Sequence, residues 1–428
     1  MHKPMQLLRM RRFLPLFVTQ FLGAFNDNLF RTAMVMLAIY TIFNSEAQEL
    51  AFSNMAQGLF ILPFFLFSAV SGQLADMMDK AKLIRWIKTA EIIIMVFGAI
   101  GIWIGHVPLM LGALFAMGVH STFFGPIKYA IIPQHLQKDD VLLGTGLVEA
   151  GTYVAILLGQ IMGGIIPPRW AAVGVIFFAV IGRISGGQVP PAPHVDAGHA
   201  VKPDLNIFRA SWRLMRDTLH VPRIRVAIFS ISFFWAIGAL LGAQFPPLVK
   251  NAIGGDEHVA TLFLAIFSIG IAVGSVAVNK LLKGVVSARY SPVSAIIMGG
   301  FVLLLWWAVG TWGGAGPHLI GVAEFITYPL AEFVMFALFG IAVFGGMYVV
   351  PLYAFLTVSV APDETARTIA VNNIVNSGFM VVAALSLGKL VDLGATVTGT
   401  LLFVAVACLL SAYIAHRLAK LGLGDRLA

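Results

Sequence analysis

Residues 291–312 read SPVSAIIMGGFVLLLWWAVGTW, a stretch without a single charged side chain. A helix needs about 20 apolar residues to cross the hydrocarbon core of a bilayer, so this stretch predicts a membrane-spanning helix. Eleven further apolar runs have similar length and composition, which predicts about twelve transmembrane helices. The predicted spans lie near residues 13–43, 52–75, 84–105, 108–132, 141–166, 168–183, 223–249, 258–282, 291–312, 327–358, 367–391 and 396–416.

The composition of the whole chain also predicts a membrane protein. Of the 428 residues, 59% are apolar and only 11% are charged, whereas soluble domains carry about 25% charged residues. The chain has one cysteine, Cys408, so a disulfide framework within the chain is excluded. We therefore expect an all-α, multi-pass membrane protein and predict no cofactor, no metal site and no catalytic residue.

Charge in the loops predicts the orientation. With a cytoplasmic N-terminus, all of the 28 Lys and Arg residues except Arg31, Arg169, Lys250 and Lys389 fall at cytoplasmic ends or loops. This is the positive-inside pattern, and it places both termini in the cytoplasm. The net charge of +8 is then a signal of topology, and no nucleic-acid partner is needed to explain it.

A polar interval divides the chain into two halves of six predicted spans. The expected organisation is an N-terminal six-helix bundle over 1–185, a cytoplasmic linker over 186–222 and a C-terminal six-helix bundle over 223–428. Within the linker, residues 205–220 have helical periodicity, with apolar residues on one face and arginines on the other. This amphipathic helix either joins the two bundles or lies at the membrane interface near anionic headgroups.

The two halves also repeat in sequence. Asp139 and Asp140 before the fifth span match Asp363 and Glu364 before the eleventh at an offset of 224 residues. Internal repeats of this kind are typical of two-halved transporters. We therefore predict two pseudo-symmetric halves and a transporter.

Charged residues inside spans cost about 2.5–3.5 kcal/mol each on insertion scales, so each needs a partner or a function. Asp27 lies near the middle of the first span, and Arg31 follows four residues later on the same helix face. The two side chains either neutralise each other or line a cavity, where they could bind a cation and an anion.

Further polar residues allow two interpretations each. Glu149 is either a cavity or proton site or a structural hydrogen-bond partner, and Lys128 either snorkels to the interface or binds a phosphate. His120 is a satisfied interior histidine or a proton carrier. Asn372, Asn373 and Asn376 form a stripe that either joins helices or lines a pore. His135 and Asp140 have the His-x4-Asp spacing of glycerolipid acyltransferases, but they lie in a short loop between spans.

Several motifs together resemble one family. The segments are Gln20-Phe-Leu-Gly-Ala-Phe-Asn-Asp-Asn28, Gly125-Pro-Ile-Lys-Tyr129, Gly146-Leu-Val-Glu-Ala150, Ser232-Phe-Phe-Trp235 and the loop Gly72-Gln-Leu-Ala-Asp76. They resemble the lysophospholipid transporters of the major facilitator superfamily. The resemblance implies the major facilitator fold and movement of lysophospholipids, such as lysophosphatidylethanolamine, inward across the bacterial inner membrane for reacylation by a separate acyltransferase and acyl-carrier-protein synthetase. We expect a monomer that works by alternating access with lateral opening.

The resemblance also implies roles for residues. In the family's signature loop an aspartate closes the cytoplasmic side, so we expect Gly72, Asp76 and Arg85 to form a cytoplasmic gate. The expected acyl-tail walls are Phe21, Phe25 and Trp235. The expected head-group residues are Asp27, Asn28, Arg31, Lys128, Tyr129, Glu149, Asn373 and Asn376.

Two other functions compete with lysolipid transport. A proton-coupled exporter of amphipathic small molecules would use Asp27 or Glu149 to carry the proton. A membrane-bound acyltransferase would use His135 and Asp140.

Overall fold

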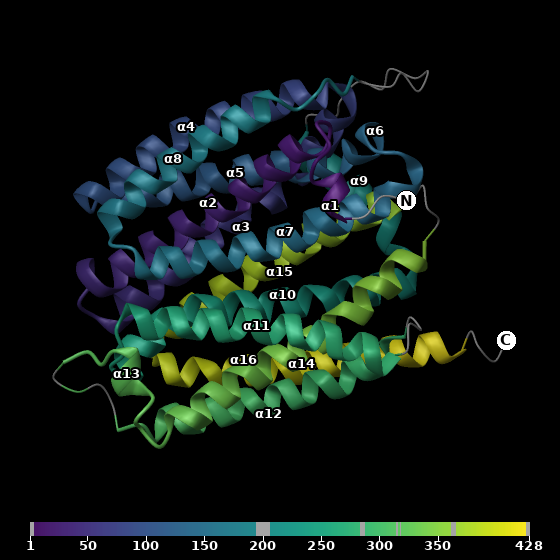
Figure 1. Cartoon of the computed structure of the whole chain (residues 1–428). Coiled ribbons are helices and arrows are strands. Elements are labelled where there is room, and N and C mark those ends of the chain that lie inside the picture. The colour runs from purple at the N-terminus through teal and green to yellow at the C-terminus, as the bar shows by residue number, and fades with distance from the viewer. Residues whose placement is uncertain are drawn as a thin grey trace. The chain divides into compact units, whose positions relative to one another are not determined.

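Long helices account for almost all of the computed structural model (Figure 1). The structure describes residues 4–193, 206–282, 287–313, 316, 318–360 and 365–424. The long helices of the N-terminal half are α2 (Leu14–Leu37), α3 (Glu46–Met77), α4 (Lys80–Ile104), α5 (Val107–Ala130), α7 (Lys138–Ile165) and α8 (Pro168–Gly187). Those of the C-terminal half are α10 (Pro222–Leu248), α11 (Glu257–Leu282), α12 (Ser291–Gly310), α14 (Ala331–Val358), α15 (Thr365–Asp392) and α16 (Val397–Gly424).

Short helices connect these elements. They are α1 (Pro4–Leu7), α6 (Ile132–His135), α9 (Ile207–Leu219), α13 (Val322–Phe325), π-helical turns at Ala38–Ile42 and Val249–Ile253, and a 3-10 turn at Ala288–Tyr290. Among the described residues no strand forms, which confirms the all-α prediction.

Ten of the helices in the described part of the chain are long and apolar enough to cross a membrane. The two other long helices are α2 and α7, with 24 and 28 residues. Of these, α2 carries a run of polar residues at its middle, Asn26, Asp27 and Asn28. The multi-pass character is therefore confirmed, and the count of twelve spans stays a prediction that rests on these two helices.

Several helices extend beyond the apolar runs from which the spans were predicted. The sixth span was expected to end at Arg183, but α8 continues to Gly187. Arg183 lies within the helix, and its Nε donates to Thr89 Oγ1 of α4 at 2.8 Å. A charged side chain therefore did not mark the end of this helix. Of the linker, residues 194–205 lie outside the described part, and α9 confirms an amphipathic helix within the predicted 205–220.

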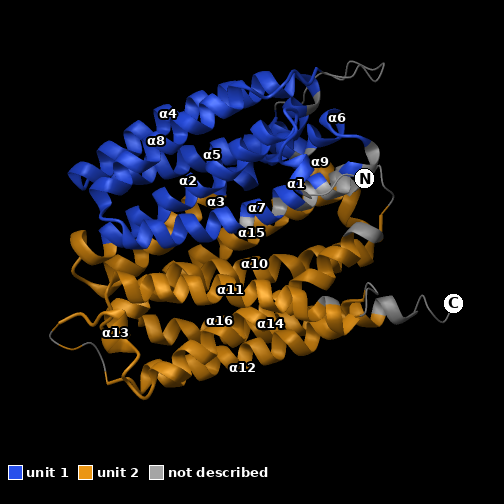
Figure 2. Cartoon of the chain, in the orientation of Figure 1, with its two compact units in different colours: residues 1–38, 62–211 blue, residues 39–61, 212–428 orange. Residues whose placement is uncertain are grey.

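The chain forms two compact units (Figure 2). Unit 1 comprises residues 1–38 and 62–211, and unit 2 comprises residues 39–61 and 212–428. Helix α3 is thus divided, since its first turns belong to unit 2 and its remainder to unit 1.

The same packing pattern occurs in both units. In unit 1, α2 packs against α7 and α8, while α4 packs against α5 and α8. In unit 2, α10 packs against α15 and α16, while α12 packs against α14 and α16. The helices correspond in chain order, first to first and sixth to sixth. This equivalence confirms the prediction of two pseudo-symmetric halves.

Residues 39–61 join unit 2 through a buried ion pair. Glu49, which is 1% exposed, accepts from Lys250 Nζ at 2.5 Å and from Asn251 Nδ2 at 2.5 Å. Lys250 also donates to the carbonyl oxygens of Ile39 and Phe43. Lys250 was one of the exceptions to the positive-inside pattern. Its charge is compensated by one carboxylate and two carbonyl oxygens.

Glycines at Gly-x-x-x-Gly spacing in α7 and α11 let the helix backbones approach closely. A side chain at Gly159 would meet the carbonyl oxygen of Phe25 in α2, and one at Gly163 would come within 2.8 Å of that of Leu29. In unit 2, a side chain at Gly274 of α11 would overlap the carbonyl of Val343 in α14. These glycines are packing residues, because each contact is with backbone, which cannot move aside.

We predict that Gly274→Ala destabilises the protein by about 1–3 kcal/mol, the usual cost of overfilling a packed contact. The control is Gly238→Ala in α10, where a side chain would meet nothing within 4 Å. The measurement is the midpoint of thermal aggregation in detergent, followed by size-exclusion chromatography. Equal midpoints for the two variants would contradict the packing role.

Candidate functional site

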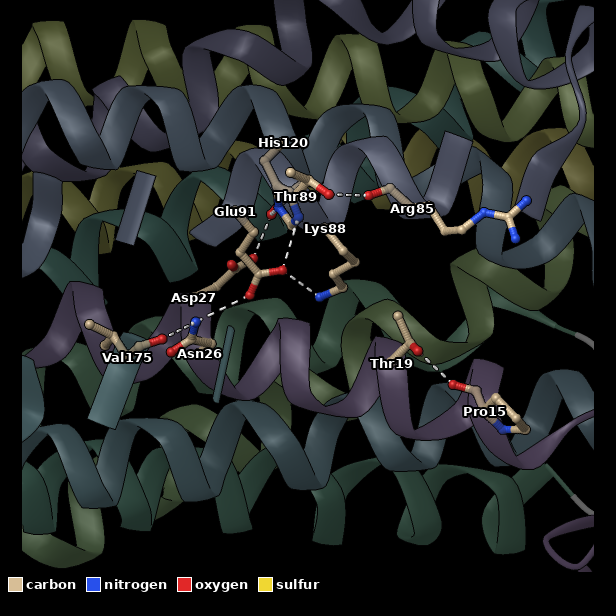
Figure 3. A network of polar contacts seen from close by, with 11 residues as sticks. Pro15, Thr19, Asn26, Asp27, Arg85, Lys88, Thr89, Glu91, His120 and Val175 are labelled. Carbon is tan, nitrogen blue, oxygen red and sulfur yellow. Dashed lines mark hydrogen bonds and ion pairs between the residues drawn. The ribbon is translucent and has the colours of Figure 1, made fainter. Parts of the chain in front are cut away.

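A network of buried polar side chains crosses unit 1 at the level of Asn26 and Asp27 (Figure 3). Its members come from α2, α4, α5 and α8. Buried polar side chains need hydrogen-bond partners, and those of this network find them in one another and in the Val175 carbonyl.

The centre of the network is Glu91 of α4, which is fully buried. Its Oε2 lies 2.5 Å from Lys88 Nζ and 3.2 Å from His120 Nε2. Its Oε1 accepts from Asn26 Nδ2 at 3.1 Å, and the same amide donates to the carbonyl oxygen of Val175 in α8 at 3.0 Å. The carboxylate therefore joins α2, α4 and α5, and Asn26 extends the network to α8.

This arrangement corrects the interpretation of Lys88, which the charge pattern assigned to the cytoplasmic end of a span. Lys88 lies eight residues into α4 and is 0% exposed. Its ammonium also lies 5.3 Å from the centre of the Phe124 ring. The network also includes Asn26, Lys88 and Glu91, which the sequence did not nominate as site residues. A lysine three residues before a glutamate inside an apolar run was the available signal.

Asp27 is the second acid of this region. It is 8% exposed, and its Oδ2 accepts from Ser121 Oγ of α5 at 2.5 Å. Its Oδ1 is buried and has no hydrogen-bond partner among the described residues. A buried carboxylate oxygen without a donor is costly, so Asp27 retains the capacity to accept from a ligand.

Arg31 and Asn28 lie one turn away on α2. Arg31 Nη2 donates to Asn28 Oδ1 at 3.1 Å, and Asn28 Nδ2 donates to the carbonyl oxygen of Ala24 at 2.8 Å. Both side chains are half-buried. Asn28 thus orients the guanidinium, a planar group of the kind that binds carboxylates and phosphates.

Lys128 lies on the same face of α5 as Ser121, since seven residues make two turns. It is half-buried in the last turn of α5. At 1.5 Å per residue, Lys128 and Ser121 are about 10 Å apart along the helix. Unit 1 therefore presents an acid, a guanidinium and an ammonium from two helices.

Unit 2 contains a second cluster, built from neutral groups. Tyr353 Oη of α14 accepts from Trp235 Nε1 of α10 at 2.7 Å and lies 3.4 Å from Asn372 Nδ2 and from Asn376 Nδ2 of α15. Ser232 Oγ donates to Asn376 Oδ1 at 2.7 Å. The buried Oδ1 of Asn372 has no hydrogen-bond partner among the described residues.

The remaining predicted residues are placed as follows. Asn373 is exposed and takes no part in the Tyr353 cluster. The other two asparagines of the predicted stripe, Asn372 and Asn376, do belong to that cluster. Trp235, expected as an apolar wall, contributes a hydrogen bond. Phe25 is buried and packs edge-on against Phe178 at 4.7 Å, while Phe21 is half-buried and stacks on Phe17 at 6.2 Å.

The expected gate is only partly described. Gly72 lies in α3 with room for a side chain around it. Arg85 lies on α4, and its guanidinium points away from Glu91 (Figure 3). The side chains of Asp76, Tyr129 and Glu149 lie outside the described residues.

The loop histidine of the acyltransferase interpretation is also placed. His135 is 6% exposed, and its Nδ1 lies 3.1 Å from the carbonyl oxygen of Arg12. Burial lowers the pKa of His135, because the charged imidazolium loses solvation. No group of three or more metal-ligating side chains gathers anywhere in the described part of the chain.

The fold and these clusters define a class: a polytopic transporter of two six-helix halves with polar groups held at membrane depth. The sequence profile of the Major Facilitator Superfamily matches residues 16–384. The chain belongs to this superfamily.

Within the superfamily, the chain is similar to lysophospholipid transporters. The chain is 28% identical over 392 residues to the lysophospholipid transporter LplT of Pectobacterium carotovorum subsp. carotovorum, which covers 89% of this chain and 86% of the relative. It is 26% identical over 345 residues to LplT of Escherichia coli (strain SE11), covering 79% and 78%.

Solved structures share the fold. The peptide transporter PepTSo superposes with a TM-score of 0.71 at 13% identity, covering 96% of this chain and 98% of that one. A D-xylose–proton symporter superposes with a TM-score of 0.68 at 13% identity, covering 95% and 96%. These likenesses confirm the predicted major facilitator fold.

We predict that Lys88→Met lowers stability by about 3–5 kcal/mol, because it leaves Glu91 buried without its closest cation. The double variant Lys88→Met/Glu91→Gln should be more stable than Lys88→Met alone. Thermal midpoints in detergent measure both effects.

The control for this prediction is His318→Gln, which removes one partner of a pair that is 71% and 46% exposed. Exposed pairs contribute about 0–1 kcal/mol. If Lys88→Met were as mild as this control, the network would not be a structural requirement.

Proposed function

We propose that this protein transports lysophospholipids across the bacterial inner membrane, moving them inward for reacylation. The proposal rests on one observation above the others, the buried Oδ1 of Asp27 without a donor among the described residues. An ethanolamine ammonium is a donor of the charge and size that this oxygen can accept.

The neighbouring cations are complementary in charge to the phosphate of the headgroup. Arg31 and Lys128 supply donors for a phosphate, and arginine binds phosphate through two parallel N–H bonds. A zwitterionic headgroup therefore finds an acid and two bases on α2 and α5. The similarity to LplT proteins over most of the chain supports the same substrate class.

The acyl tail needs no polar site. It can remain in the bilayer while the headgroup is moved, so a lateral opening during alternating access suffices. We further propose that both termini are cytoplasmic, that the protein acts as a monomer without enzymatic activity of its own, and that a separate acyltransferase reacylates the product.

We predict that Asp27→Asn reduces uptake of lysophosphatidylethanolamine by about tenfold, the equivalent of losing one charge-assisted hydrogen bond. Uptake of lysophosphatidylglycerol, which has no ammonium, should fall less. The measurement is the initial rate of labelled lysolipid uptake into proteoliposomes, with Glu332→Gln as control because Glu332 is an exposed acid in the first turn of α14.

Other outcomes would overturn the assignment. Equal losses for both lysolipids would mean that Asp27 supports the fold rather than the ammonium. Export of the substrate, or uptake that collapses when an uncoupler is added, would favour the proton-coupled exporter. Acyl transfer by the purified protein would favour the acyltransferase.

A further inference from the structure

Helix α9 exposes two large aromatic side chains outside the membrane spans. Phe208 is 73% exposed and Trp212 is 66% exposed. With 13 residues and three arginines, α9 is too short and too polar to cross a bilayer. Exposed aromatic groups on a cytoplasmic or periplasmic segment call for a partner.

The apolar face of α9 is longer than the protein surface that covers it. Toward its C-terminal end, Met215 and Leu219 pack against the apolar core of unit 2. Phe208 and Trp212 continue the same face, since the four positions are spaced by three or four residues. The N-terminal half of this face is therefore available to something other than this core.

Basic residues lie beside the exposed aromatics. Arg209, Arg213 and Arg216 are exposed and share the next face of the helix. Asp217 is the one acid of α9, and its Oδ1 lies 3.3 Å from Arg216 Nε. The face thus keeps a net positive charge next to aromatic rings, the composition of helices that lie in a membrane interface.

The connection to α10 fixes the depth of this surface. Helix α9 ends at Leu219 and α10, a candidate membrane span, begins at Pro222. Three Cα–Cα steps reach at most about 11 Å, so α9 stays close to the end of a span. Arg223 and Arg225 in the first turn of α10 mark that end as the headgroup region.

We propose that α9 is an interfacial helix that binds anionic phospholipid headgroups. Phe208 and Trp212 insert at the boundary between headgroups and acyl chains, while the three arginines contact lipid phosphates. This inference does not depend on the transported substrate.

The test uses the full chain in vesicles of phosphatidylcholine with increasing phosphatidylglycerol. Because Cys408 is the one cysteine and is buried, a Cys408→Ala background allows a single spin label at Trp212→Cys, and separately at Phe208→Cys. We expect phosphatidylglycerol to make the label accessible to oxygen and shielded from an aqueous nickel reagent. Combining the label with Arg209→Gln/Arg213→Gln/Arg216→Gln should raise the phosphatidylglycerol content needed about tenfold or abolish the shift.

The matched control is Arg9→Gln/Arg11→Gln/Arg12→Gln, which removes the same charge from three exposed arginines elsewhere. It should leave the shift in place. The proposal is overturned if the label stays accessible to water in every lipid mixture, or if it is shielded from both reagents regardless of lipid, as in a protein contact. It is also overturned if the control triple abolishes the shift equally.

Discussion

The carboxylate of Glu91 is the interaction on which the interior of unit 1 depends. A charge buried among apolar helices is tolerated only when partners surround it, and Glu91 obtains them from Asn26 on α2, Lys88 on its own helix and His120 on α5. Because Asn26 must meet Glu91 and the Val175 carbonyl together, the rotation of α2 is fixed. Asp27, the next residue, is thereby directed to Ser121 of α5. The structural network and the candidate binding residue are therefore positioned by the same contacts.

Close backbone packing fixes α2 from another direction. Gly159 and Gly163 bring α7 against the carbonyls of Phe25 and Leu29, so α2 is held by backbone contact with α7 and by polar contact with α4, α5 and α8. Unit 2 also combines the two kinds of contact, but between other helices: Gly270 and Gly274 bring α11 against α14, and a polar cluster lies where α10, α14 and α15 meet. The two halves therefore share their helix arrangement without sharing the position of their glycine contacts.

The helices were predictable because the length and hydropathy of a span are local properties of the sequence. What a charged side chain does inside a span depends on a partner elsewhere in the chain. Lys88 was expected at a membrane surface because nothing near it showed that His120 and Asn26 converge on the adjacent Glu91. Arg183 was expected to end a helix because its partner, Thr89, lies 94 residues away. Asp27 was found from sequence because an acid near the middle of a span is rare, whereas Asn26 was missed because its partners, Glu91 and the Val175 carbonyl, lie 65 and 149 residues away.

The two polar clusters differ in the chemistry that they can perform. Unit 1 carries ionic groups, and unit 2 carries amides, hydroxyls and an indole joined through Tyr353. A neutral cluster can bind any polar head weakly, but it cannot distinguish an ammonium from a glycerol hydroxyl by charge. Under the proposed function, selectivity for a zwitterionic headgroup would come from unit 1, where Asp27 Oδ1 and Asn26 Oδ1 of α2 are buried without a donor among the described residues and only Asp27 carries a carboxylate. Its neighbour Glu91 is less suited to this role, because Asn26 and Lys88 already donate to it and His120 Nε2 lies 3.2 Å away.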